Sequence, residues 1–231
     1  MLNETIEAAD GGRFGAYVAR PATTPTAAIV VIQEIFGVNQ VMRELTDAYA
    51  ALGYLAICPD IFWRIEPGID ITDQSEEEWK RAFELFQAFN VNQGVEDLKA
   101  TIAHARNMDG SNGKVGTVGY CLGGKMAYLM ATRSDADANV SFYGVGLDEL
   151  LGESGNISAP YLSHIASEDG FVPKEAQEKI DAGLSGNPKV TLHTYEGNDH
   201  AFARKGGAHY DEAAATLANQ RTAEFFAANL S

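Results

Sequence analysis

Short apolar runs alternate with longer amphipathic segments along most of this chain. The apolar runs have strand length and predict strands at residues 13–19, 27–33, 54–58, 114–120, 140–143, 160–165 and 190–195. The segments between and after them predict helices at residues 42–52, 75–88, 93–106, 122–132, 172–184 and 212–229. Strands that alternate with helices predict an α/β fold, in which helices cover both faces of a mostly parallel sheet.

Composition narrows the range of functions. The chain has 231 residues and no internal repeat, which predicts one domain over residues 1–231. Its formal net charge of -15 disfavours nucleic-acid binding, because that function needs clustered Lys and Arg. No apolar run is long enough to span a membrane, and the start of the chain has no secretory pattern. We therefore expect a cytoplasmic monomer that acts on a small molecule.

The two cysteines, Cys58 and Cys121, are too few for a disulfide framework and suit a reducing compartment. The chain has no paired cysteines and no His-Glu-x-x-His run, so no metal or organic cofactor is implied. A buried, packing thiol is the simplest interpretation of Cys58. Cys121 differs because of the residues around it.

Cys121 lies in the run Gly119-Tyr120-Cys121-Leu122-Gly123-Gly124, between a predicted strand and a predicted helix. A nucleophile on such a turn adopts a strained backbone that lifts its side chain above the sheet, and the flanking glycines leave room where the backbones nearly touch. Leu122 begins the helix, so its N–H can stabilise an oxyanion, and the helix N-terminus favours a thiolate. A phosphate-binding loop is the alternative, but Met126 follows Lys125 where such a loop needs Ser or Thr.

Hydrolases with this turn carry nucleophile, acid and base in that chain order. The base is predicted to be His200, which follows the strand at 190–195 and precedes the last helix. The acid is predicted to be Asp169, after the strand at 160–165, with Glu168 as its alternative. Asp199 is adjacent to His200 and is interpreted as a solvated loop residue. The other histidines are interpreted as packed or surface residues: His104, His164, His193 and His209.

The loop after residues 27–33 is the other expected source of an oxyanion N–H. It reads Glu34-Ile35-Phe36-Gly37, and the position of Ile35 makes its N–H the predicted partner of Leu122. A carboxylate at Glu34, directly after an apolar strand, is unusual and is either functional or a capping charge. Together these features predict an α/β-hydrolase fold without a large cap domain.

At this point the sequence resembles the dienelactone hydrolase family, the carboxymethylenebutenolidases. The resemblance covers most of residues 30–205. It is carried by these segments: residues 33–39 (QEIFGVN), 58–60 (CPD), 87–89 (QAF), 111–115 (SNGKV), 119–124 (GYCLGG), 143–146 (YGVG), 169–173 (DGFVP) and 200–204 (HAFAR).

The resemblance implies an enzyme of chlorocatechol breakdown that opens dienelactone to maleylacetate through a cysteine acyl-enzyme. It implies Cys121, Asp169 and His200 as the triad. The family glutamate that matches Glu34 takes part in activating the thiol when substrate binds. Arg204 matches an arginine that anchors the substrate carboxylate.

A second family arginine has a less direct match in this chain. The family pattern places Trp79 at its position, so Arg81 or Lys80 would have to supply the charge. Phe36 and Tyr143 are candidate walls of the substrate pocket.

Three other interpretations remain. The chain could be a thiol esterase for another small carboxylate-bearing ester or lactone, or a binding protein that keeps the fold without turnover. It could also use Cys121 as a redox sensor, although no resolving cysteine is nearby in the sequence.

Overall fold

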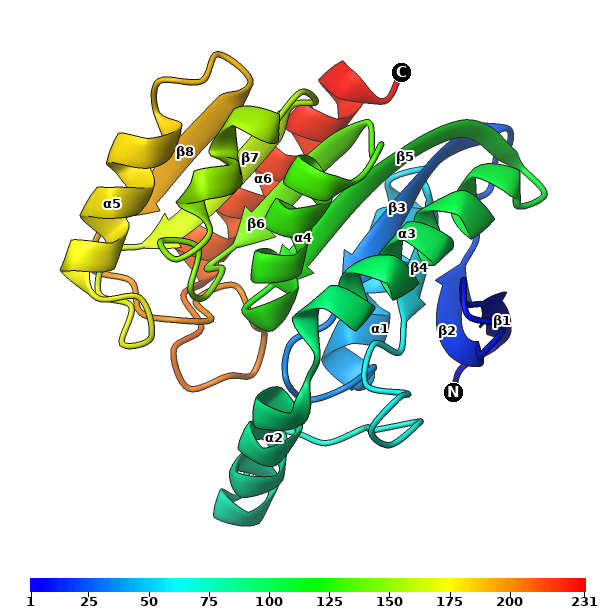
Figure 1. Ribbon diagram of the computed structural model, residues 1–231, viewed down its shortest axis with the longest axis horizontal. Coiled ribbons are helices and arrows are strands. Elements are labelled where there is room, and N and C mark those ends of the chain that lie inside the picture. Colours follow the sequence, from blue (N-terminus) through cyan, green and yellow to red (C-terminus); the bar gives the residue numbers. More distant parts are fainter. The chain divides into compact units, whose positions relative to one another are not determined.

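The computed structural model describes residues 1–231, which divide into two compact units, residues 1–117 and residues 118–231. Each unit contains a layer of strands with helices on both faces (Figure 1). No helix combines the length and the hydrophobicity that crossing a lipid bilayer requires. The predicted alternation of strands and helices is therefore confirmed within each unit.

The first unit begins with an antiparallel edge and continues as a parallel sheet. Its strands are β1 (Glu4–Glu7), β2 (Arg13–Ala19), β3 (Thr26–Ile32) and β4 (Leu55–Pro59), in the order β1-β2-β4-β3 with β5 (Ser111–Tyr120) beside β3. β3 and β4 pair in parallel, whereas β2 pairs antiparallel with both β1 and β4. Its helices are α1 (Gln40–Ala51), α2 (Glu76–Ala88) and α3 (Val91–Asn107). α1 and α3 lie on opposite faces of these strands (Figure 1).

The second unit is built on the end of β5 and on three further strands in the order β5-β6-β7-β8. These are β6 (Ala138–Phe142), β7 (Tyr161–Ala166) and β8 (Val190–Tyr195), and both β6 with β7 and β7 with β8 are parallel pairs. Its helices are α4 (Leu122–Arg133), α5 (Lys174–Leu184) and α6 (Glu212–Asn229), with a 3-10 helix at Leu151–Asn156. α4 and α5 cover one face, and α6 covers the other (Figure 1).

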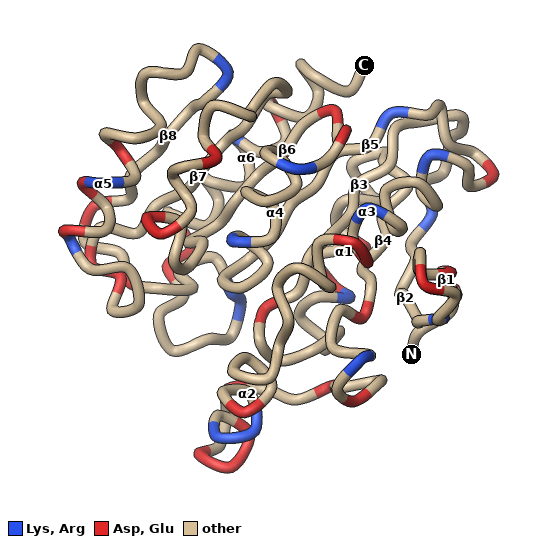
Figure 2. Tube along the Cα trace, in the orientation of Figure 1, with Lys and Arg blue, Asp and Glu red and all other residues tan.

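Charge is excluded from the central strands of each unit. β3, β4, β6 and β7 contain no Lys, Arg, Asp or Glu, and the charged residues gather on helices and loops (Figure 2). Every residue of β4 and β6 is buried, as the continuous apolar runs predict for strands covered on both faces.

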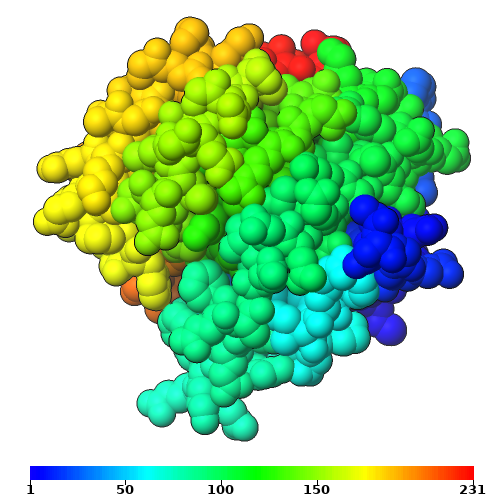
Figure 3. Space-filling model, in the orientation of Figure 1, coloured from blue at the N-terminus to red at the C-terminus, as the bar shows by residue number.

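The boundaries of α2 follow from its sequence. The Ser75 hydroxyl accepts a hydrogen bond from the N–H of Glu78 at 3.2 Å, and three glutamates occupy the first turn. Only Ala82 and Leu85 of this helix are buried, and it forms a bulge on the surface of its unit (Figure 3).

Most of the predicted elements occur within one to three residues of their expected bounds, and β2, β8 and α6 match them. The segment predicted as a helix from residue 172 begins at Lys174, because Pro173 is the cap that precedes α5. Two elements were not predicted: β1, a four-residue strand that is exposed along much of its length, and the 3-10 helix. Both are too short to show a hydrophobic period.

Candidate active site

Cys121 has the strained backbone that its turn predicts. Its φ is 56° and its ψ is -115°, a region that residues other than glycine rarely adopt. The N–H of Cys121 donates to the carbonyl oxygen of Phe142 at 3.1 Å, and the carbonyl oxygen of Cys121 accepts from the N–H of Lys125 at 3.1 Å. The first turn of α4 therefore holds this conformation in place, and the thiol is partly exposed.

The glycines around Cys121 are required by close backbone approach. A Cβ on Gly119 would lie 1.8 Å from the carbonyl oxygen of Gly123. A Cβ on Gly124 would lie 2.7 Å from the carbonyl oxygen of Phe142 and 2.8 Å from the Cα of Gly144. The prediction that these glycines leave room for strand and helix to meet is confirmed.

Leu122 is the first residue of α4 and is buried. Its N–H lies in the first turn, where a helix has no internal acceptor for its N–H groups. The positive end of the helix dipole lies at the same place. Leu122 therefore has the position of an oxyanion donor beside Cys121.

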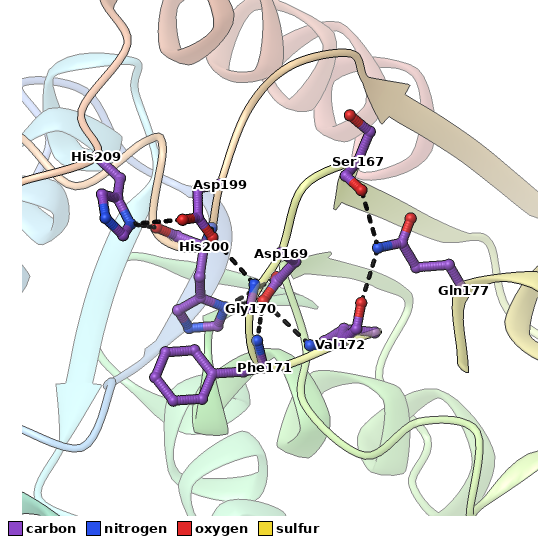
Figure 4. Close-up of polar contacts among 9 residues, drawn as sticks. All are labelled: Ser167, Asp169, Gly170, Phe171, Val172, Gln177, Asp199, His200 and His209. Carbon is purple, nitrogen blue, oxygen red and sulfur yellow. Dashed lines mark hydrogen bonds and ion pairs between the residues drawn. The ribbon is translucent and has the colours of Figure 1, made fainter. Parts of the chain in front are cut away.

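His200 and Asp169 are in direct contact (Figure 4). The Nδ1 of His200 lies 2.9 Å from Oδ2 and 3.0 Å from Oδ1 of Asp169, and the two side chains are 6% and 1% exposed. Glu168, the alternative acid, instead pairs with Lys174 at 3.1 Å on the surface. The structure thus favours Asp169 as the partner of His200.

Backbone groups fix the orientation of the Asp169 carboxylate. Its Oδ1 accepts hydrogen bonds from the N–H of Phe171 at 2.8 Å and from the N–H of Val172 at 3.2 Å (Figure 4). The Asp169 carboxylate therefore accepts hydrogen bonds from two backbone N–H groups and contacts one ring nitrogen. Because a carboxylate only accepts hydrogen bonds, the proton on the His200 ring is placed on Nδ1.

The other ring nitrogen of His200, Nε2, is buried and makes no hydrogen bond. Burial by itself lowers the pKa of His200, but the charges of Cys121 and Asp169 outweigh it and raise the pKa to about 10. The charge of Cys121 thus acts on the ring, and a proton that leaves the sulfur would be held on Nε2 as an imidazolium.

Aromatic rings enclose the His200 imidazole. Tyr143 lies edge-on to it with ring centroids 5.1 Å apart, and Phe171 does the same at 4.8 Å. Tyr143 was predicted as a pocket wall and is 2% exposed. Phe171 was not predicted, although it belongs to the segment of residues 169–173, and it is 51% exposed. An exposed aromatic directly after a candidate acid is the sequence signal that could have identified it.

Arg204 belongs to the same turn-rich segment as His200. Its N–H donates to the carbonyl oxygen of Ala201 at 2.9 Å, and its carbonyl oxygen accepts from the N–H of Gly207 at 3.0 Å. These hydrogen bonds fix the backbone of Arg204, which lies four residues after His200 in the sequence. Its role as a carboxylate anchor stays a prediction.

The remaining predicted residues belong to the first unit. Glu34 and Ile35 lie two and three residues beyond the end of β3 and are buried, at 3% and 5% exposure. Phe36 is buried and lies edge-on to Trp79 at 5.1 Å. Arg81 forms ion pairs with two carboxylates of its own unit, Glu66 at 2.5 Å and Glu84 at 3.1 Å. The roles predicted for these residues in catalysis and substrate binding stay predictions.

Asp199 lies in a loop with a side chain that is 39% exposed, as interpreted, but it also makes two hydrogen bonds to backbone groups. Its Oδ1 accepts from the backbone N–H of His200 at 2.6 Å and from that of Gly170 at 3.0 Å. His209, interpreted as a packed or surface residue, lies 3.4 Å from Oδ2 of Asp199. The sequence could not show this, because the contacts join two loops that are far apart in the chain.

A cysteine on a strained strand-to-helix turn, followed along the chain by a contacting aspartate and histidine, is the arrangement typical of the α/β-hydrolase class. The sequence matches the profile of the dienelactone hydrolase family over residues 14–230. The chain therefore belongs to the dienelactone hydrolase family.

Individual relatives agree with this assignment. A protein of Azospirillum brasilense is 53% identical over the full length of both chains. The carboxymethylenebutenolidase of Pseudomonas putida is 44% identical, over 98% of this chain and 97% of its own. A crystal structure of a protein from Klebsiella pneumoniae has a TM-score of 0.84 at 27% identity and covers 98% of both chains. The predicted fold class is thereby confirmed.

Proposed function

We propose that this chain hydrolyses a small lactone through a thioester formed on Cys121, with His200 as the base and Asp169 as its partner. One observation carries the proposal: a buried imidazole is held by Asp169 through Nδ1 while its Nε2 makes no hydrogen bond. Cys121, on a strained turn, supplies the charge that raises the pKa of this ring. A nucleophile, a base and a group that orients the base are the minimum set for covalent catalysis.

The reaction has two stages. In the first, the thiol proton passes to His200 and the Cys121 thiolate attacks the lactone carbonyl carbon. The ring C–O bond breaks, and the ring oxygen leaves as an enolate that takes up the proton from His200. In the second, water attacks the thioester and His200 accepts a proton from the water. The C–S bond then breaks and the acyl group leaves as a carboxylate. The N–H groups of Leu122 and Ile35 are the proposed donors to the oxyanion in both stages.

Glu34 is proposed to take part in activating the Cys121 thiol when substrate binds. It is a carboxylate with 3% exposure two residues beyond the end of the apolar strand β3, and the family resemblance assigns this role to the matching residue.

Dienelactone is the proposed substrate, and maleylacetate the product. The support is membership in the family and the 44% identity to a carboxymethylenebutenolidase over nearly the whole chain. Arg204, close to His200 in the chain, is the proposed anchor for the substrate carboxylate. Arg81 already pairs with Glu66 and Glu84, so binding a substrate carboxylate would require it to exchange these partners.

The test is a substrate panel with the purified protein, in which ring opening of dienelactone is compared with hydrolysis of neutral aryl esters. We expect Cys121→Ala to abolish hydrolysis while the protein still folds, and Cys121→Ser to leave much less activity. Full activity in Cys121→Ala would refute the proposed nucleophile. Faster turnover of neutral esters than of dienelactone would favour a general thiol esterase.

A further inference from the structure

The Asp199 carboxylate joins the two loops that carry the proposed acid and base. One oxygen, Oδ1, accepts from the N–H of Gly170, next to Asp169, at 3.0 Å, and from the N–H of His200 at 2.6 Å (Figure 4). A single oxygen therefore links the backbone of His200 to the backbone of Gly170, the residue that follows Asp169. Asp199 is bonded to backbone groups and not to the His200 ring, so it acts on the ring through the main chain.

His209 completes this arrangement from the segment before α6. Its Nδ1 lies 3.2 Å from the carbonyl oxygen of His200 and 3.4 Å from Oδ2 of Asp199. Both neighbours are oxygen acceptors, so Nδ1 is the nitrogen that carries the proton. The peptide at His200 is thus held at both ends, its N–H by Asp199 and its carbonyl by His209.

The backbone here needs such restraint because the residue after His200 is strained. Ala201 has a φ of 64°, one of three positive φ values at residues other than glycine, and the other two are at Cys121 and Tyr143. A left-handed alanine costs roughly 1–2 kcal/mol and persists only where surrounding contacts hold it. Relaxation of Ala201 to negative φ would rotate the peptide that positions the His200 ring.

The loops are joined farther from the site as well. The N–H of Gly197 donates to the hydroxyl of Ser167 at 2.8 Å, and the N–H of Glu168 donates to the carbonyl oxygen of Asn198 at 2.8 Å. These bonds join the loops next to the ends of β7 and β8. The hydrogen bonds of Asp199 lie farther along the loops, next to His200. Removing Asp199 should therefore loosen the position of the ring without separating the strands.

We propose that Asp199 and His209 are positioning residues that hold His200 against Asp169 by clamping the backbone on either side of His200. The proposal rests on the function proposed above, since it assigns these residues to the same site. Burial by itself raises the pKa of Asp199, but the N–H groups of His200 and Gly170 outweigh it and lower the pKa. The Asp199 carboxylate is therefore ionised at neutral pH and is a strong hydrogen-bond acceptor.

The experiment measures the pH dependence of Cys121 alkylation by iodoacetamide, together with kcat and KM for dienelactone. Alkylation does not need turnover, so it tests the clamp even if the proposed substrate proves wrong. We compare wild type with Asp199→Ala, which removes the acceptor, and Asp199→Asn, which keeps one oxygen for the two N–H groups. Asp211→Ala is the matched control, because Asp211 caps α6 through the N–H of Ala214 at 2.8 Å and does not bond to His200.

We expect Asp199→Ala to lower kcat about tenfold or more while KM changes little, since misplacement of a catalytic group mainly slows the chemical step. The alkaline limb of the alkylation profile should move from near pH 10 toward the ordinary histidine value of about 6.5 as His200 loses its fixed partners. Asp199→Asn should restore most of both properties, and Asp211→Ala should leave the profile unchanged.

Two results would overturn the proposal: an unchanged alkylation profile in Asp199→Ala, or an Asp199→Asn variant as impaired as Asp199→Ala. If Asp199→Ala does not fold, His209→Phe decides. It keeps a ring of similar size at a half-exposed position and removes the donor to the carbonyl of His200. A shift of the profile in the same direction supports the clamp, and a profile identical to wild type refutes it.

Discussion

Replacement of Asp169 by Asn tests how the proposed base is oriented. Two backbone N–H groups point at Oδ1 of Asp169, so the oxygen of the new amide is held at that position. The amide nitrogen then occupies the position of Oδ2, 2.9 Å from the Nδ1 of His200. Two donors cannot face each other at this distance, so the imidazole proton must move from Nδ1 to Nε2.

A proton on Nε2 removes the function proposed for His200, because that nitrogen can no longer accept a proton from the thiol or from water. In serine proteases the corresponding change lowers kcat roughly 10⁴-fold, or about 5.4 kcal/mol at 1.36 kcal/mol per tenfold. A thiol ionises more readily than a hydroxyl and depends less on its base. We therefore expect a fall in kcat of roughly 10³-fold to 10⁴-fold, with KM nearly unchanged.

The assay follows ring opening of dienelactone under single-turnover and steady-state conditions. Glu168→Gln is the matched control, since Glu168 is the adjacent acid and pairs with Lys174 on the surface. Thermal unfolding of both variants shows whether the fold is retained. If Asp169→Asn stays folded and keeps kcat within tenfold of wild type, the tautomer argument is wrong.

Three further predictions concern the turn, a buried histidine and the proposed anchor. Gly119→Ala should lower the free energy of unfolding by about 3 kcal/mol or more, because its Cβ would meet backbone at 1.8 Å, whereas Gly186→Ala, with open space around it, should change urea unfolding little. Burial lowers the pKa of His164 well below 6.5, so the folded state binds fewer protons than the unfolded state below pH 6.5. The stability that is present above pH 6.5 should therefore be lost as the pH falls, by up to about 1.36 kcal/mol per pH unit. Urea unfolding at pH 7.5 and 5.5 checks this, and a pH-independent free energy would contradict it. Arg204→Ala should raise KM about tenfold or more for carboxylate-bearing substrates only, and an equal rise for neutral esters in steady-state assays would indicate a structural role.

The sequence was sufficient for the parts of the site that depend on local geometry. Cys121 could be identified because its turn needs small residues at fixed spacing, and the structure shows the backbone contacts that impose them. Asp169 and His200 could be identified because each follows a strand in the order expected for a hydrolase. Their contact at 2.9 Å agrees with this expectation.

The sequence could not show contacts between distant loops. Asp199 and His209 contribute through hydrogen bonds to backbone groups, and such bonds leave no pattern in the sequence. Arg81 is an example in which the sequence predicted a substrate contact but could not show the ion pairs that the side chain makes. Its charge fits a substrate anchor, but its pairing with Glu66 depends on how α2 lies beside the preceding loop.

The pairing of β7 with β8 has a consequence for which changes this protein tolerates. The two strands are aligned residue by residue as far as Ala166 and Tyr195, and the proposed acid and base lie in the loops that follow, three and five residues farther on. A slip of two residues would keep every side chain on its own face, yet it would move one loop along the other by about 6.6 Å, more than twice the distance that joins Asp169 to His200. The hydrogen-bond register of β7 and β8 therefore fixes the distance between the two loops. An insertion inside either strand should abolish activity, whereas an insertion in the exposed turn around Gly186 should not.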